Sequence, residues 1–356
     1  GYLGPKGDTT TNVIDLEIKG IGSGVINRPN LFSRFFLEYQ YGKSLIPEFD
    51  KFKPDVIISA NSPLLAQREI IAWAQSKRVR FIYWLQDIHS LALKSILRKK
   101  LGFLSLVPGK FYESLERRLL TRADHVVAIC KDFEDILLSW QVSEKKISVV
   151  PNWAPIESIP VRPQDNIFSR RFGFAGKFVV MYTGTLGYKH NPGMIAEAAK
   201  RMKNEDFLFV VVSEGAGLEY LKTEKNNCAL DNLFLIPFQP FTILPEVLGT
   251  AGIFFVTLEQ EAGIYSVPSK VWACFCAGRP TVVAVSHSNL AARITSANEC
   301  GLVISPDSID ELINALRKLR RDKALSDRLG SNARVYAENN FNIHHITNKF
   351  ESILRN

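Results

Sequence analysis

The segment KFVVMYTGTLGYKHNPGMIAEAAKRM, residues 177–202, decides the fold of this chain because it contains a strand, a glycine-rich loop and a helix in succession. Residues 178–183 are apolar, aromatic or β-branched without interruption, which is typical of a strand that is buried on both faces. From Asn191 onward, the apolar residues recur at helical spacing. Units of this kind build the parallel sheets of α/β proteins.

The rest of the chain repeats this alternation. Helical patterns cover 191–204, 308–322 and 323–341, and they lie between short apolar runs. Strands that are apolar throughout and separated by helices indicate parallel sheets covered on both faces. The further runs predicted as strands are 55–60, 80–85, 125–130, 146–151, 207–213, 233–238, 252–258, 281–285 and 301–306.

The length of 356 residues exceeds one ordinary hydrophobic core, so we expect two Rossmann-like α/β domains. Residues 1–155 form the first predicted domain and 177–335 the second. Between them, the proline-rich stretch 156–176 is predicted as a linker. Residues 336–356 are predicted as a C-terminal helical segment that packs back on the first domain.

The composition excludes several classes of protein. A hydrophobic content of 46% with 22% charged residues describes a globular protein rather than a disordered one. Five cysteines without a C-x-x-C pair predict reduced, buried thiols and neither a zinc site nor a disulfide framework. No apolar stretch reaches the roughly 18–20 residues that a spanning helix needs. The net charge of +8 predicts an anionic partner.

The loop after the strand 177–184 is a candidate phosphate-binding site. Gly184, Thr185, Gly187 and Lys189 lie between that strand and the following helix. Glycine allows backbone N–H groups to approach an anion, and a helix N-terminus adds partial positive charge. The alternative is a tight turn with a solvated lysine.

A second loop begins in EAGIYSVPSKVWACFCAGRPTVVA, residues 261–284. Glu261 and Gly263 follow a strand, while Pro268 suits the first turn of a helix, with Ser269 and Lys270 beside its unsatisfied N–H groups. This position favours a diphosphate, and the glutamate can accept hydrogen bonds from sugar hydroxyls. The alternative is a helix cap with surface charges.

We expect neither a metal nor a cofactor. Gly215 and Gly217 begin a glycine pattern, but Tyr220 stands where a dinucleotide fingerprint requires a third glycine. No D-x-D follows a strand in a setting typical of metal sites.

In the first domain, FIYWLQDIHSLAL places Asp87 and His89 just beyond a predicted strand. Ligands of parallel α/β sheets bind at the carboxyl ends of strands, so this D-x-H is a candidate catalytic pair. A lone histidine is more often structural, which is the alternative.

In the order and spacing of its motifs, the chain resembles the retaining, GT4-like family of GT-B glycosyltransferases, which includes bacterial polysaccharide and lipid-linked glycan transferases. The motifs are VVPNWAP, YTGTLGYKHNP, IPFQPFTILPEVLGTAGIFFV and VPSKVWACFCAGRPTVVA. The resemblance implies two domains that face each other across a cleft, the first for the acceptor and the second for a nucleotide-activated sugar.

The resemblance also implies roles for the candidate residues. Gly184 to Gly187 with Lys189 would lie near the diphosphate, and Ser269 with Lys270 opposite. The backbone at Phe238 and Gln239 would meet the base, and Glu261 with its neighbour Gly263 would meet the donor sugar. Similar D-x-H segments place the histidine, here His89, beside the sugar and diphosphate.

The chain departs from the family pattern in two places. Many relatives carry a second glutamate eight positions after the first, where this chain has Ser269; the family spacing from Gly278 gives Ala273. The contact with the ribose is therefore unassigned. Only NVIDLEIKG, residues 12–20, precedes the strand at 55–60, so the first domain is expected to lack its first βα unit in this chain, as in a truncated sequence.

Residues 94–122 contain eight basic residues and two acidic ones around the apolar LGFLSLVP. Basic residues beside apolar ones suit an anionic bilayer, which predicts a protein that is cytoplasmic and peripheral on the inner face of the plasma membrane. The alternative is a helix pair with its apolar face in the core. No recognition motif supports nucleic-acid binding.

The predicted function is transfer of a sugar from a nucleotide-diphosphate donor, a UDP-sugar, to a glycan or lipid-linked acceptor in cell-surface polysaccharide biosynthesis. Retention and independence of metal are expected. Lys189 and Lys270 would stabilise the charge that develops on the leaving diphosphate. The alternatives are a nucleotide-sugar epimerase of the same fold and a non-catalytic nucleotide-sugar-binding protein.

Overall fold

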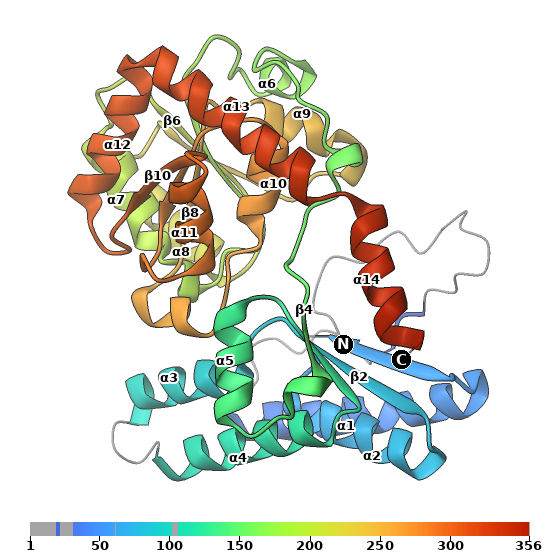
Figure 1. Ribbon diagram of the computed structural model, residues 1–356. Helices are drawn as coiled ribbons and strands as arrows, with labels where there is room; N and C mark the ends of the chain where they lie inside the picture. The colour runs from blue at the N-terminus through green and yellow to red at the C-terminus, as the bar shows by residue number, and fades with distance from the viewer. Residues whose placement is uncertain (1–18, 22–30, 61, 102–105, 356) are drawn as a thin grey trace. The chain divides into compact units, whose positions relative to one another are not determined.

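The computed structural model of the chain describes residues 19–21, 31–60, 62–101 and 106–355 (Figure 1). The chain divides into two compact units, Gly1–Pro151 with Ile353–Asn356, and Asn152–Ser352. Each unit is built on its own parallel sheet, which confirms the prediction of two α/β domains.

The first unit contains a four-stranded sheet in the order β1-β2-β3-β4, with every pair of neighbours parallel. Its strands are β1 (Val56–Ala60), β2 (Arg80–Leu85), β3 (His125–Ala128) and β4 (Ile147–Val149). Its helices are α1 (Leu31–Phe52), α2 (Leu64–Lys77), α3 (His89–Leu101), α4 (Leu106–Arg122) and α5 (Lys131–Ser139).

Helix α1, which sequence analysis did not predict, lies before β1 and packs closely on α2. A Cβ atom at Gly42 would come within 2.8 Å of the Ala66 backbone, so this glycine allows the two helices to approach. The Phe49 and Trp73 rings lie 5.1 Å apart, and the Trp73 indole donates a hydrogen bond of 3.1 Å to Asp50. Of the segment 12–20, on which the expected absence of a first βα unit depends, residues 12–18 lie outside the described residues.

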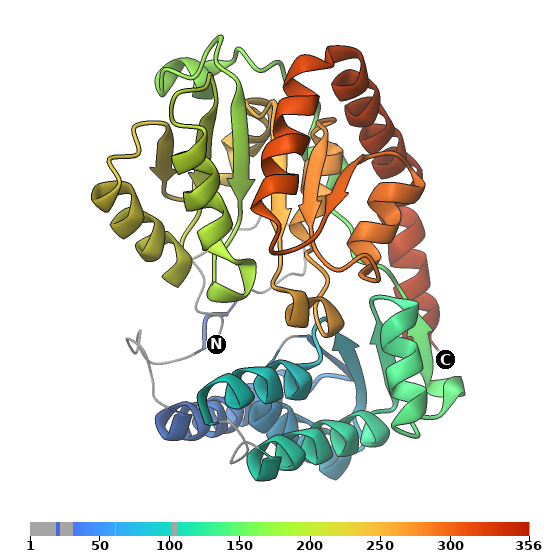
Figure 2. The same cartoon turned by 90° about the vertical axis from the view of Figure 1, so that its left-hand side faces the viewer.

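The second unit contains a six-stranded parallel sheet in the order β10-β9-β8-β5-β6-β7 (Figure 2). Counted along the chain, this order is the 3-2-1-4-5-6 arrangement of Rossmann folds, which reverses direction between β5 and β8. The carboxyl ends of those two strands therefore form the expected ligand-binding edge. The strands are β5 (Val179–Thr183), β6 (Leu208–Val212), β7 (Leu233–Ile236), β8 (Ile253–Thr257), β9 (Thr281–Ala284) and β10 (Gly301–Ile304).

Every strand predicted above is present, and the three helical patterns correspond to helices α7, α12 and α13. Between the helices and this sheet lies a core that includes Tyr182, Phe209 and Phe255, all at most 3% exposed. The helices of the unit are α6 (Ile167–Arg171), α7 (Pro192–Arg201), α8 (Ala216–Asn227), α9 (Leu244–Gly249), α10 (Lys270–Cys276), α11 (Leu290–Ala297), α12 (Ile309–Arg321), α13 (Lys323–Asn340) and α14 (Ile343–Arg355).

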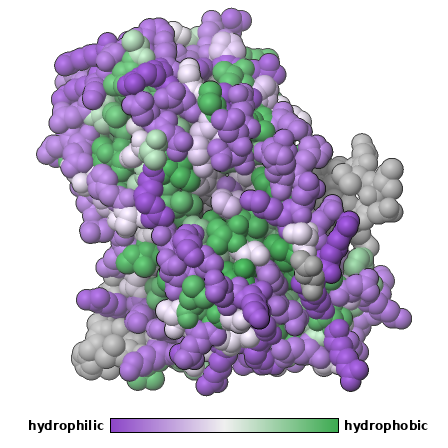
Figure 3. Space-filling view, viewed as in Figure 1, coloured by the Kyte–Doolittle hydropathy of each residue, from purple (hydrophilic) through white to green (hydrophobic). Residues whose placement is uncertain are grey.

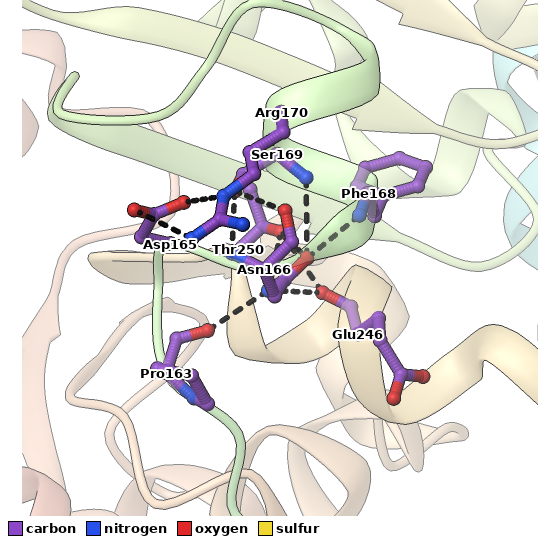
Figure 4. A network of polar contacts seen from close by, with 8 residues as sticks. All are labelled: Pro163, Asp165, Asn166, Phe168, Ser169, Arg170, Glu246 and Thr250. Carbon is purple, nitrogen blue, oxygen red and sulfur yellow. Dashed lines mark hydrogen bonds and ion pairs between the residues drawn. The ribbon is translucent and has the colours of Figure 1, made fainter.

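The stretch 156–176, predicted as a linker, lies within the second unit, which begins at Asn152. Asn166 anchors it (Figure 4): its carbonyl oxygen accepts hydrogen bonds from the first turn of α6, and its amide donates to the carbonyls of Pro163 and Glu246. The same amide lies 3.1 Å from the Thr250 hydroxyl at the end of α9. These polar contacts bind the segment to α9.

The C-terminal boundary also differs from the prediction. Position 335/336 falls inside α13, so no segment begins there. The last residues, Ile353–Asn356, group with the first unit, where the Arg80 guanidinium donates a hydrogen bond of 2.8 Å to the Leu354 carbonyl. The end of the chain thus packs on the first unit, although the body of α14 belongs to the second.

The five cysteines are free thiols, as the sequence predicted, and all except Cys228 are buried. None of the helices in the described residues combines the length and apolar character that crossing a membrane requires.

We expect Asn166→Ala to lower the free energy of unfolding by about 1–2 kcal/mol, because the variant loses the N-cap of α6 and the hydrogen bonds that join this segment to α9. Chemical denaturation measures the change. The control is Asp165→Ala, which removes an exposed ion pair with Arg170 and should cost less than about 0.5 kcal/mol. Equal stability of Asn166→Ala and the wild type would contradict this role for Asn166.

Candidate functional site

The loops that follow β5 and β8 meet at the carboxyl edge of the second sheet. The Glu259 backbone N–H donates a hydrogen bond of 2.8 Å to the Lys189 carbonyl. The Lys189 ammonium in turn lies 3.3 Å from the hydroxyl of Ser266, which is buried. These contacts join the two segments that sequence analysis selected separately.

Gly184 provides the space for the Lys270 side chain. Its φ of +96° favours glycine, and a Cβ atom there would lie 3.4 Å from the Lys270 Cε. The loop after β6 fixes this position, since the Gly184 N–H donates to the Val212 carbonyl and the Ser213 hydroxyl donates to the Gly184 carbonyl. A side chain at Gly184 would require an unfavourable positive φ and would contact the Lys270 stem.

Lys270 holds a partly buried ammonium group whose contacts are all neutral. It donates to the Tyr182 hydroxyl and, over 3.2 Å, to the Thr185 carbonyl, and it lies 4.4 Å from the centre of the Tyr182 ring. Among the described residues, no carboxylate forms an ion pair with it. Burial and the nearby charge of Lys189 lower the pKa of Lys270 to about 7. Lys270 therefore has a second cation, Lys189, as a neighbour and only neutral groups as hydrogen-bond partners.

The loop's backbone contributes less than sequence analysis predicted. The Gly187 N–H donates a hydrogen bond of 3.0 Å to the His190 Nδ1, and the Leu186 N–H donates to the Glu214 carbonyl. Burial and the two lysine charges hold the pKa of His190 far below its usual range, so the ring stays neutral and accepts this bond. The Gly184 N–H is also paired, so three N–H groups of this loop already have partners within the protein.

The helix starts also differ from the prediction. A 3-10 turn, Tyr188–His190, separates the glycine loop from α7, and α10 begins only at Lys270, so that Pro268 precedes the helix. The exposed Ser269 occupies the N-cap position, but its side chain makes no capping hydrogen bond. The alternative interpretation of this serine as a helix cap therefore finds no support.

Glu261 and Gly263 lie in the 3-10 turn Gln260–Ile264, and the glutamate is exposed. Asn289, which sequence analysis missed, fixes this turn: its amide donates to the carbonyls of Gly263 and Ser266 over 2.9 and 3.0 Å. Its carbonyl oxygen caps α11. Asparagine is a preferred N-cap before a helix, and that signal could have identified the residue.

Phe238 and Gln239 follow β7 at the same edge of the sheet, two strands from β5. Both are half-buried, and the Gln239 amide donates a hydrogen bond of 2.8 Å to the Pro237 carbonyl. Among the described residues, no hydrogen bond or ion pair links either residue to Lys189 or Lys270.

In the first unit, Asp87 and His89 follow β2, and His89 begins α3. A residue from α4, Glu116, lies beneath them: its two carboxylate oxygens accept hydrogen bonds of 2.9 and 2.8 Å from the N–H groups of His89 and Ser90. Burial raises the pKa of Glu116 to about 7 despite these bonds. Sequence analysis counted Glu116 only as one acidic residue of a basic segment.

Comparison with known proteins covers both units. Residues 26–153 match the model of the "Glycosyl transferase 4-like domain", and residues 164–336 match that of "Glycosyl transferases group 1". The two matches together span most of the chain and each falls almost wholly within one unit.

Three proteins illustrate the similarity. An Escherichia coli (strain K12) protein, provisionally named a colanic acid biosynthesis glycosyl transferase, is 22% identical over 86% of this chain and 75% of its own length. An Escherichia coli UDP-Gal:alpha-D-GlcNAc-diphosphoundecaprenol alpha-1,3-galactosyltransferase is 27% identical over 72% of this chain and 64% of its own length. The crystal structure of Anabaena HepE with UDP and glucose superposes with a TM-score of 0.72 at 15% identity, over 89% of this chain and 81% of that one.

We expect the effect of Lys270→Met on stability to depend on pH. The wild-type lysine has a pKa of about 7 when folded and 10.5 as its ordinary value, so the unfolded chain binds more protons between these values. The unfolding free energy of the wild type should therefore rise relative to the variant as pH increases from about 6 to about 9. Urea denaturation without nucleotide measures both proteins. A difference that stays constant with pH would show that Lys270 is not strained by burial.

Proposed function

This chain belongs to the GT4-like glycosyltransferases of the GT-B fold, and on that premise we propose that it moves a sugar from a UDP-sugar to a lipid-linked glycan. It is an enzyme of glycan biosynthesis, and the identity of its donor is part of the proposal. The observation that carries the proposal is the charge of Lys270, which lies beside Lys189 at the carboxyl edge of the second sheet without an ion-pair partner among the described residues. A diphosphate has the charge and size that such a place attracts.

The proposed chemistry is mainly electrostatic. As the bond between the sugar and the diphosphate breaks, negative charge gathers on the leaving UDP and the anomeric carbon becomes cation-like. Lys189 and Lys270 are held by the Ser266 hydroxyl and the Tyr182 ring, so they stabilise this charge without first reorganising. These two cations supply the positive charge of the site, and we propose that the transfer proceeds with retention and without a metal.

The remaining candidate residues take the roles that the family resemblance implies. The exposed Ser269 hydroxyl is proposed to bind the diphosphate beside Lys270, and the exposed Glu261 to accept hydrogen bonds from the sugar. Phe238 and Gln239 are proposed to meet the base. His89, which is 27% exposed, is proposed to act on the donor sugar and diphosphate during transfer, with Asp87 beside it.

The acceptor and the membrane form a separate part of the proposal. One face of α4 exposes Val107 (79%) and Phe111 (51%), and Lys110, Arg118 and Arg122 are exposed along the same helix. Figure 3 shows apolar and hydrophilic residues side by side on the face of the first unit that carries α3 and α4. We propose that this face rests on an anionic, cytoplasmic leaflet, where a lipid-linked acceptor is found. The side chains of residues 99–106, which the prediction included, lie outside the described residues.

We expect Lys189→Ala and Lys270→Ala each to weaken UDP binding by about 1–3 kcal/mol, the scale of a lost charge-assisted hydrogen bond. Titration calorimetry measures the affinity. The control, Lys222→Ala, removes an exposed lysine of α8 that pairs with Glu219 and should leave the affinity unchanged. Wild-type affinity in both variants would remove these loops from the donor site.

We expect His89→Ala to reduce turnover by about a hundredfold or more while the melting temperature stays close to that of the wild type. The assay follows UDP release from UDP-glucose, UDP-galactose, UDP-N-acetylglucosamine and UDP-N-acetylgalactosamine, with and without undecaprenyl-diphosphate-linked sugars. The control is His344→Ala, an exposed position at the start of α14. Full turnover in His89→Ala would leave this histidine with a structural role only. If the acceptor does not increase the release of UDP by the wild type, the result would argue against transfer.

We expect the protein to sediment with vesicles that contain anionic phospholipid at low salt, and to be partly released at high salt. Changing Arg98, Lys99 and Lys100 to glutamate should release most of it, since each basic residue near such a surface contributes about 1 kcal/mol. The charge-matched control changes Lys200, Lys203 and Lys222, which are exposed on the second unit, to glutamate. This control should release less protein from the vesicles. Wild-type protein that stays in the supernatant at low salt would exclude the membrane proposal and favour a soluble acceptor.

A further inference from the structure

Helix α3, which begins with His89, takes its N-terminal cap from a distant helix. The residue before it, Ile88, is fully buried and has no side-chain acceptor, although its carbonyl accepts the Ala92 N–H over 3.1 Å. The Glu116 carboxylate accepts the N–H groups of His89 and Ser90 instead, from 27 and 26 residues further along the chain. A serine or aspartate at position 88 would cap the helix locally, so capping alone does not require a glutamate from another helix.

The position of Glu116 is costly for a charged group. Its side chain is 0% exposed, and burial raises its pKa to about 7. The groups that face it are Asp87, whose charge raises this pKa further, Tyr83 on β2 and the ring of His89 on α3. None of them is a cation of fixed charge. The Ser90 side chain and the backbone N–H groups of Ser90 and His89 stabilise the charged form instead.

One carboxylate oxygen of Glu116 lies near both the backbone and the ring of His89. Glu116 Oε1 lies 2.9 Å from the His89 backbone nitrogen and 3.9 Å from the ring Nδ1. The ring edge that carries Nδ1 therefore points toward the interior, and the side chain keeps 27% of its surface exposed.

We infer that Glu116 is a positioning residue for sugar transfer: its buried carboxylate fixes the first turn of α3 and, with it, the orientation of the His89 ring, whose Nδ1 faces the same carboxylate. The inference rests on the proposed role of His89 in the transfer. Ionised Glu116 offers an acceptor to both N–H groups and a negative charge beside the imidazole, and protonated Glu116 loses one acceptor and the charge.

The test is Glu116→Gln, which preserves size and removes the charge. The glutamine amide has one oxygen that can accept a hydrogen bond and one NH2 group that cannot. One of the two backbone N–H groups therefore loses its acceptor, and the first turn of α3 should loosen. With a UDP-sugar that the wild type turns over, we expect kcat to fall by about tenfold to a hundredfold near pH 8.5. The affinity for UDP should fall much less than kcat, because Lys189 and Lys270, which are proposed to bind the diphosphate, are unchanged in this variant. The matched control, Glu113→Gln, is one turn away on α4 and removes only the surface pair with Lys94.

The pH dependence separates positioning from simple stability. Below about pH 6 wild-type Glu116 is protonated and resembles the amide, so the ratio of wild-type to variant kcat should approach one, and it should grow as pH rises through about 7. A ratio that does not vary with pH would overturn the inference and leave Glu116 as a structural cap.

Amide hydrogen exchange tests the same contact without turnover. A peptide that includes His89 and Ser90 should exchange faster in Glu116→Gln than in the wild type or in Glu113→Gln at pH 8, and equal exchange would overturn the inference. If no UDP-sugar is turned over by the wild type, the proposed function fails, and this exchange result alone then decides whether Glu116 orders His89. Full turnover in His89→Ala would overturn the inference even if exchange is faster.

Discussion

The ammonium group of Lys270 sets the central constraint of this structure, because it is partly buried and has no carboxylate partner among the described residues. Its neighbours are the Tyr182 hydroxyl and ring, the Thr185 carbonyl and a second cation, Lys189. Burying a charge without a counter-ion is unfavourable, and the lowered pKa expresses that cost. An anion bound at this point would offset that cost, and the proposed diphosphate is an anion of this kind.

The elements around this lysine are arranged to keep it in place. Reversal of the strand order between β5 and β8 leaves an open edge where two loops can converge. Gly184 leaves room for the lysine stem, the neutral His190 occupies the Gly187 N–H, and Asn289 holds the turn that carries Glu261. The first unit shows the opposite case in Glu116, a buried carboxylate that backbone N–H groups satisfy. Lys270 and Glu116 are thus charged groups whose burial is unfavourable, and each follows or contacts a segment at the carboxyl end of its unit's sheet.

The sequence predicted the features that depend on residues close together in the chain. Apolar runs located every strand, because burial on both faces leaves an unbroken pattern, and Gly184 and Lys270 stood out at the ends of two such runs. Helix α1 was missed because Pro47 and scattered aromatic residues obscure its period. The prolines before Asn166 suggested a linker, although its amide binds α9, 80 residues further on. Glu116 was missed for the same reason, since no local pattern shows which helix start a distant carboxylate will reach.

The pKa of the Lys270 ammonium, measured by NMR with and without UDP, tests this account most directly. A titration of the free protein should give a value near 7, and bound UDP should raise it by at least about one unit, because a diphosphate stabilises the charged form. The Lys222 ammonium on α8 serves as an internal reference and should not change. A Lys270 pKa that stays the same when UDP is bound would contradict the claim that this lysine forms the diphosphate site.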